Sequence, residues 1–204
     1  MDQNAFVANE AYGNVDERAT TVGSFSYRPE VSDSYHAVYH DPRTSQTMVG
    51  IRGTADFKDV LSDVSIVGGV EDMDPRFRAS ERKLQEITNT LGHGDYGNVK
   101  VMGHSLGGQV VSRLVARHGL KGLEGHAYNP GSGPLQTLSN SKCHIFNTEE
   151  CANQRAGLHI HTVDGDPLSV AWHITTNAAS ATHTRYAPQG FNAHSMFNFS
   201  RAYR

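Results

Sequence analysis

The sequence predicts an α/β domain with three layers, in which helices cover both faces of a mostly parallel sheet. Three observations favour this fold. Apolar runs typical of buried strands alternate with stretches of helical periodicity along the 204 residues. A Gly-x-Ser-x-Gly pentapeptide stands between one such strand and one such helix. No internal repeat, linker or low-complexity segment divides the chain, so we expect one domain over residues 1–204.

Four elements are predicted in the first third of the chain. Residues 3–12 carry apolar side chains at helical spacing, and residues 34–40 and 46–51 alternate in the manner of strands. The Asp-Pro-Arg-Thr sequence between these two strands is typical of a turn. Residues 55–63 show the apolar stripe of a short helix.

A longer helix is predicted over residues 75–91. Pro75 suits its first turn, and Gly92 ends it. The remaining predicted elements are a strand just before the pentapeptide, a helix over 106–118, strands over 124–129 and 157–163, and loops with short strands or a final helix in the last forty residues.

The pentapeptide is Gly103-His104-Ser105-Leu106-Gly107, which has the form of a nucleophile elbow. Glycines on either side permit a strained turn, and the hydroxyl is then held at the end of the sheet beside a helix N-terminus. This geometry suits acyl transfer through a covalent serine ester. Ser105 is therefore the predicted nucleophile.

The serine needs a histidine as its base and a carboxylate that orients the imidazole. In many enzymes with such an elbow, the acid and then the histidine follow the serine in the chain. Asp164 and Asp166 follow the strand predicted over 157–163. Asp166 is preferred because the proline after it favours an extended backbone, and Asp164 is the alternative. His194 lies in a late loop and is the predicted base, whereas His173 is expected to be structural.

The mechanism also requires an oxyanion hole, meaning N–H donors that face the developing negative charge. One predicted donor is the backbone amide of Leu106, directly after the nucleophile. The other is Thr54, which follows the strand over 46–51 and a glycine that permits a sharp turn. Thr54 also suits the N-cap of the next helix, and both roles can hold together.

These motifs together resemble the class 3, or fungal-type, lipases. Residues 49–54 (Val-Gly-Ile-Arg-Gly-Thr) are similar to that family's first signature, and residues 101–108 (Val-Met-Gly-His-Ser-Leu-Gly-Gly) to its elbow. Asp166-Pro167-Leu168 resembles the acid motif, His194 falls where the family's histidine is expected, and the opening helix that ends in Tyr12 is also similar.

The resemblance implies an α/β-hydrolase fold, a Ser105–Asp166–His194 triad and an oxyanion hole formed by Thr54 and Leu106. It implies hydrolysis of carboxylic esters, either acyl glycerols or short-chain esters, without a cofactor. One departure concerns the lid. The segment between Asp63 and residue 75 holds too little apolar surface for an amphipathic lid, which favours a small esterase with an open site.

Two rival hypotheses remain. A hydrolase fold can serve a binding or structural protein that has little or no catalytic activity, and the fold alone does not decide between the two. His159 and His161 share one face of a strand and, with Asp164 and Asp166 nearby, could bind zinc. Histidines on a half-buried strand more often serve packing, so we expect no metal site.

The formal net charge of −3 and the scattered basic residues predict no nucleic-acid partner. No apolar run is long enough to span a membrane, so a soluble protein with at most peripheral lipid contact is expected. The N-terminal residues do not resemble a secretory signal, which favours the cytoplasm over secretion. For Cys143 and Cys151, two reduced thiols are accordingly favoured over a disulfide. The acyl chain, the alcohol, the choice between ester, thioester and amide, and the oligomeric state stay open.

Overall fold

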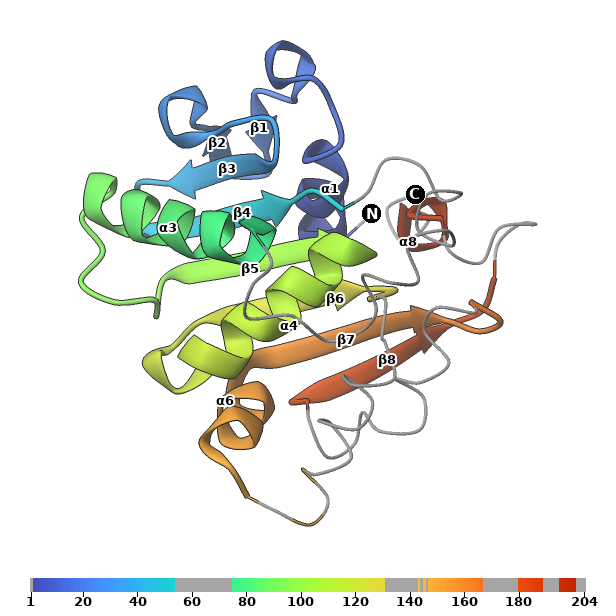
Figure 1. The fold of residues 1–204 in the computed structure, drawn as a ribbon. Coiled ribbons are helices and arrows are strands. Elements are labelled where there is room, and N and C mark those ends of the chain that lie inside the picture. Colours follow the sequence, from blue (N-terminus) through green and yellow to red (C-terminus); the bar gives the residue numbers. More distant parts are fainter. Residues whose placement is uncertain are drawn as a thin grey trace.

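A mixed sheet runs through the part of the chain that the computed structural model describes (Figure 1). The described residues are 2–53, 75–130, 143, 145, 147–166, 180–188 and 195–200. The sheet has eight strands, and their order in space is their order in the sequence. The strands are β1 (Thr21–Val22), β2 (Phe25–Tyr27), β3 (His36–Asp41), β4 (Gln46–Ile51), β5 (Val99–His104), β6 (Glu124–Tyr128), β7 (Leu158–Val163) and β8 (Thr182–Tyr186).

Strand direction divides the sheet into two parts. From β1 to β4 neighbouring strands are antiparallel, and from β4 to β8 they are parallel. Parallel neighbours need a connection that crosses a face of the sheet, usually a helix. The described helices are α1 (Gln3–Glu10), α3 (Pro75–Thr90), α4 (Leu106–His118), α6 (Glu149–Gly157) and α8 (Phe197–Ser200), and the short 3₁₀ helices are η1 (Val15–Glu17), η2 (Pro29–Val31) and η5 (Gly119–Lys121).

Two apolar cores lie on opposite faces of the sheet. Figure 1 shows α3, α4 and α6 in front of the strands, where Leu84 and Leu114 pack with Val101 of β5. On the other face, Val7 of α1 packs with side chains such as Met102 of β5. Strands buried on both faces carry nearly continuous apolar runs, which is why β5 could be recognised from its sequence. The predicted three-layer α/β class is confirmed.

The observed elements match most of the predicted ones. The hairpin of β3 and β4, the helices α3 and α4, and the strands β6 and β7 lie within two residues of the predicted bounds. Helix α6 was not predicted, because its sequence has few apolar side chains. Its signal lay in its first turn, where Thr148 Oγ1 accepts a hydrogen bond from the Cys151 amide and two glutamates follow the cap. The helix predicted over 55–63 lies outside the described residues.

Cys143 and Cys151 form a disulfide, which corrects the expectation of two reduced thiols. Their Cα atoms are 5.6 Å apart, a separation that a disulfide spans without distortion. The Thr148 cap fixes Cys151 in the first turn of α6, on the side where Cys143 packs. The expectation rested on the N-terminal residues, which carry no information about this local geometry.

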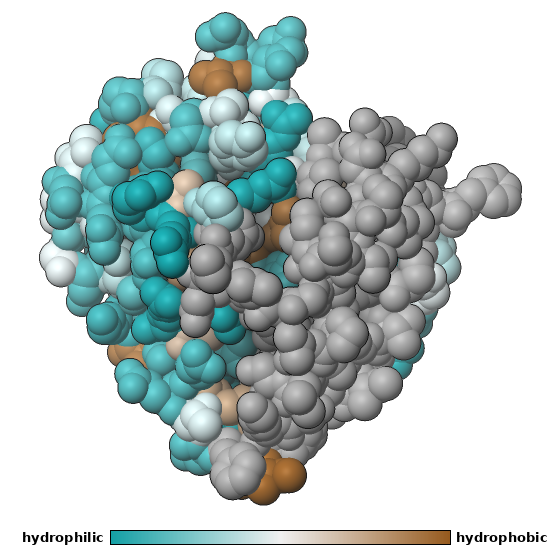
Figure 2. Space-filling view, in the orientation of Figure 1, coloured by the Kyte–Doolittle hydropathy of each residue, from teal (hydrophilic) through white to brown (hydrophobic). Residues whose placement is uncertain are grey.

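The surface of the described residues is mainly hydrophilic on the side that α3, α4 and α6 cover (Figure 2). Hydrophobic side chains appear there only in small, separate patches among the described residues. Large apolar side chains are exposed at Tyr35, Leu120 and Ile145, and isolated exposures of this kind are common in proteins. Within the described part of the chain, no helix is both long and apolar enough to cross a membrane.

Close packing of α1 against β4 gives a test of the fold. A Cβ at position 50 would collide with the carbonyl oxygen of Val7 and lie 3.3 Å from the Cβ of Ala11. We expect Gly50→Ala to lower the free energy of unfolding by about 2 kcal/mol, because the helix must move away from the sheet. Urea denaturation measures the change. Gly94→Ala is the matched control, since its Cβ would meet no described atom within 4 Å. Equal stability of the two variants would contradict this packing.

Candidate active site

Ser105 lies between β5 and α4 in a strained backbone conformation. Its φ is 56° and its ψ is −123°, a region that costs a residue with a side chain about 1–3 kcal/mol. Hydrogen bonds at both the amide and the carbonyl of Ser105 stabilise this conformation. The Ser105 amide donates to the Tyr128 carbonyl on β6 (3.0 Å), and the Ser105 carbonyl accepts from the Gln109 amide of α4 (3.1 Å). Ser105 as a whole is almost fully buried, with 3% of its surface exposed.

The glycines around Ser105 permit the close approach of three backbone segments. A Cβ on Gly103 would lie 2.5 Å from the Gly107 carbonyl oxygen, so the strand before the turn touches the helix after it. A Cβ on Gly107 would collide with the Ile51 carbonyl oxygen at the end of β4. Any larger residue would push the elbow apart, which explains the Gly-x-Ser-x-Gly spacing physically.

Tyr12 contacts His104, the residue directly before Ser105. Its hydroxyl donates to the His104 carbonyl (3.2 Å) and lies 3.2 Å from His104 Nδ1. Burial raises the pKa of Tyr12 to about 12, against the lowering effect of a backbone hydrogen bond with Gly53, so the hydroxyl stays a donor at neutral pH. Helix α1 ends at Glu10, and Tyr12 lies just beyond it. The sequence marked Tyr12 as the end of a helix, but nothing in it indicated this contact.

The two candidate acids differ sharply in their surroundings. Asp166 is fully buried beyond the C-terminal end of β7, and its amide donates to the Val163 carbonyl (3.2 Å). Asp164 has a side chain that is 48% exposed and pairs with Nε (2.8 Å) and a terminal nitrogen (2.7 Å) of Arg185 on β8. Asp164 is thus engaged in a surface ion pair. Because parallel strands end at the same edge, Asp166 and Ser105 both lie at the C-terminal edge of the sheet.

Asn129 joins the ends of β6 and β7 at this edge. Its φ is 39°, and its amide donates to the His161 carbonyl (2.7 Å). Its side-chain oxygen accepts from the Val163 amide (2.8 Å), three residues before Asp166. The sequence did not predict this role of Asn129. A possible signal was an asparagine between a buried strand and a proline, since asparagine tolerates a positive φ better than most residues.

The structure describes three of the five predicted site residues. Ser105 and Asp166 lie at the same edge of the sheet, and Leu106 is the first residue of α4, so its amide belongs to a helix N-terminus. Thr54 and His194 lie outside the described residues, as does the segment where a lid was expected to be short or absent. The triad and the oxyanion hole therefore stay predictions.

The four residues of the rival zinc hypothesis, His159, His161, Asp164 and Asp166, lie in different surroundings. His161 is buried with its Nδ1 3.2 Å from the Tyr186 hydroxyl, and burial lowers its pKa to about 3, with further lowering from the neighbouring histidines. Among the described residues, the group that could hold a metal ion contains His159 but neither Asp164 nor Asp166.

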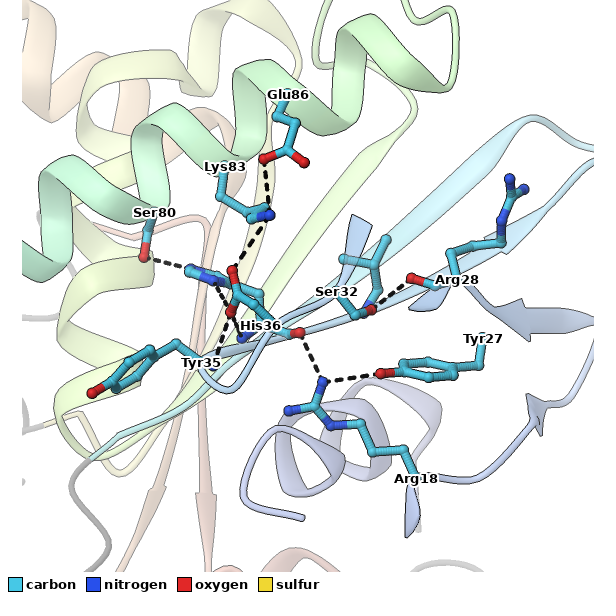
Figure 3. Close-up of polar contacts among 11 residues, drawn as sticks. Arg18, Tyr27, Arg28, Ser32, Tyr35, His36, Ser80, Lys83 and Glu86 are labelled. Carbon is cyan, nitrogen blue, oxygen red and sulfur yellow. Dashed lines mark hydrogen bonds and ion pairs between the residues drawn. The ribbon is translucent and has the colours of Figure 1, made fainter. Parts of the chain in front are cut away.

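A second Ser-His-Asp arrangement lies elsewhere, under α3. Asp33 Oδ1 is 2.8 Å from His36 Nδ1. On the other side of the ring, His36 Nε2 is 2.9 Å from the Ser80 hydroxyl (Figure 3). Ser80 is buried in the middle of α3, where the backbone amides serve the helix and leave no donors for an oxyanion. Among the described residues, this arrangement therefore serves to attach α3 to the start of β3.

Searches for related proteins support the fold. No protein-family model matches the chain, and no curated protein matches it. Among solved structures, the Lip2 lipase of Yarrowia lipolytica is similar with a TM-score of 0.54 at 14% identity, over 91% of this chain and 76% of that one. The fold is that of the α/β-hydrolases.

Two further structures are similar over shorter parts. A ferulic acid esterase is similar with a TM-score of 0.42 at 15% identity. The matched part covers 57% of this chain and about half (52%) of the esterase. The acylaminoacyl peptidase of Pyrococcus horikoshii is similar with a TM-score of 0.41 at 13% identity. The matched part covers 59% of this chain and 24% of the peptidase.

The Asp33 contact predicts a pH-dependent stability. Burial alone would raise the pKa of Asp33, but the hydrogen bond with His36 and the Lys83 ammonium at 3.4 Å hold it well below its ordinary value. A carboxyl group whose pKa is depressed in the folded state stabilises the fold at a pH above its pKa in the unfolded chain, which is about 4. This stabilisation is lost as the pH falls through the lower pKa of the folded state.

We expect Asp33→Asn to cost about 1 kcal/mol at pH 7, an amount reduced by solvent screening because the side chain is 38% exposed. Urea denaturation measures the free energy of unfolding of the variant and of the unmodified protein. The difference between the two should become smaller as the pH falls toward 3. Glu86→Gln, which removes a 50% exposed partner of the same lysine, is the control and should cost little. A gap that stays constant over this pH range would refute the assignment.

Proposed function

We propose that the protein is a serine hydrolase that cleaves carboxylic esters, with Ser105 as its nucleophile, and that it is related to the class 3 lipases. The observation that carries the proposal is the strained backbone of Ser105. Strain at a residue with a side chain persists only where the surrounding structure enforces it, and it concentrates at functional sites. The close contacts of Gly103 and Gly107 enforce it here.

The proposed reaction passes through an acyl-enzyme. The Ser105 oxygen attacks the ester carbonyl while His194 takes the hydroxyl proton, and the amides of Leu106 and Thr54 stabilise the oxyanion. Collapse of this intermediate breaks the ester C–O bond, and the alcohol leaves with the proton from His194. A water molecule then attacks the acyl group, again with His194 as the base, which releases the acid and restores the serine.

Asp166 is the proposed acid of the triad. A buried carboxylate can fix the tautomer of the histidine and stabilise its charged form. Full burial of Asp166 supports this role, and the ion pair of Asp164 with Arg185 argues against the alternative. The proposed mechanism requires no cofactor.

The proposed substrates are small, dispersed esters. The sequence between Asp63 and residue 75 offers little apolar surface for a lid, and the described surface in Figure 2 carries only small hydrophobic patches. The compartment stays a prediction. A disulfide such as Cys143–Cys151 is typical of oxidising compartments.

Labelling with a fluorophosphonate probe tests the nucleophile. We expect the protein to react with a stoichiometric amount of probe and Ser105→Ala not to react, because the probe needs an activated serine. Ser80→Ala is the matched control and should react fully, since Ser80 belongs to the other Ser-His-Asp arrangement. Absence of labelling in the unmodified protein, together with no hydrolysis of short esters, would favour a binding protein on a hydrolase fold.

A panel of nitrophenyl esters of increasing acyl length tests the proposed substrate class. We expect kcat/KM to fall by about tenfold or more between short and long acyl chains, because no apolar lid would hold a long chain. Rates are measured below and above the solubility limit of each ester. A sharp rise in rate above that limit would contradict the lidless esterase and indicate a lipase.

A further inference from the structure

Three imidazole rings lie together on the sheet face that also carries α1. His126 of β6 and His159 of β7 are register partners, so their side chains lie side by side, with ring centroids 4.8 Å apart. His161 follows on the same face of β7, and its ring lies 5.4 Å from that of His126. Glu124 lies two residues before His126, and its Oε1 is 2.9 Å from His126 Nε2.

The stacked rings of His126 and His159 each have a hydrogen-bonding partner at Nδ1. His126 Nδ1 lies 3.1 Å from His161 Nε2, and His159 Nδ1 lies 2.8 Å from the Thr182 hydroxyl on β8. Histidines that bind a metal through one nitrogen usually have the other nitrogen hydrogen-bonded in this way, which fixes the ring. The Nε2 atoms are then the ones that can face an ion.

We propose that Glu124, His126 and His159 form a binding site for a divalent transition-metal ion, with zinc as the best candidate. Their ligand atoms lie within 4.8 Å of one another. Two imidazoles and one carboxylate form a ligand set that zinc accepts, with water as its fourth ligand. The Glu124 side chain is about one-third exposed (34%) and can close the remaining distance by rotation.

Three present contacts compete with the ion, and one of them is the hydrogen bond between Glu124 Oε1 and His126 Nε2. The Lys100 ammonium pairs with Glu124 Oε1 at 3.0 Å, and the Asn4 amide lies 3.1 Å from His126 Nε2. Lys100 is one-third exposed and can turn into solvent when an ion takes its place. Its positive charge would repel the ion, so removing that charge should strengthen binding.

The site would stabilise the fold and take no part in ester cleavage. Glu124 pairs in register with Lys100, whereas Tyr128, whose carbonyl holds Ser105, pairs with His104. Four residues of strand therefore separate Glu124 from the elbow, which is about 13 Å. An ion bound here would join β6 to β7 in the half of the sheet away from Ser105. This proposal differs from the expectation of no metal site.

Zinc titration by calorimetry tests the proposal on protein first treated with a chelator. We expect the unmodified protein to bind a single zinc ion and to gain thermal stability with it. Glu124→Gln and His159→Gln should each weaken binding by about tenfold or more, because each removes a ligand. Lys100→Gln keeps every ligand and should strengthen binding. Circular dichroism verifies that each variant is folded.

His118→Gln is the matched control. His118 pairs with Glu81 at 3.0 Å, as His126 does with Glu124, but no second imidazole joins this pair to make a metal group among the described residues. Zinc binding should therefore not change. Absence of binding in the unmodified protein, or binding that survives both ligand substitutions, would overturn the proposal, as would weaker binding in Lys100→Gln.

Discussion

The strained turn at Ser105 is the constraint on which the arrangement of the site depends. The turn exists because β5, α4 and the end of β4 approach so closely that only glycine fits at positions 103 and 107. The β6 ladder then fixes the serine amide, and Tyr12 fixes the residue before it. Three parts of the chain that are far apart in sequence thus determine one backbone conformation. The fold itself therefore holds the serine in place, which is the preorganisation that the proposed nucleophile requires.

Local patterns predicted most of the fold. The sequence pattern of buried parallel strands and amphipathic helices predicts them well, as for β5 and α4. The Gly-x-Ser-x-Gly motif predicted the turn between these two elements. Short or polar elements gave no such signal. The first two strands of the sheet, β1 and β2, contain only two and three residues. Helix α6 depends on its capping threonine and its disulfide more than on an apolar stripe.

Long-range polar contacts could not be predicted, because nothing in a sequence shows which distant groups will meet. Asn129 bonds β7 across 34 positions, and the Tyr12 hydroxyl reaches His104 across 92. The predicted Ser105 and Asp166 do lie at one edge of the sheet, since chain order and strand direction imply that much. The same limit explains Asp33, His36 and Ser80, whose catalytic-looking geometry arises where no motif suggested it.

The sheet keeps its strands in chain order from β1 to β8. During synthesis, each new strand can therefore pair with one that has already emerged from the ribosome, and the sheet can grow at a single edge. No strand must wait for a later one or be inserted between two earlier partners. Pairing between sequence neighbours keeps loop closure short and limits the time for which an unpaired edge is open to another chain. The topology thus favours orderly folding as well as holding the site.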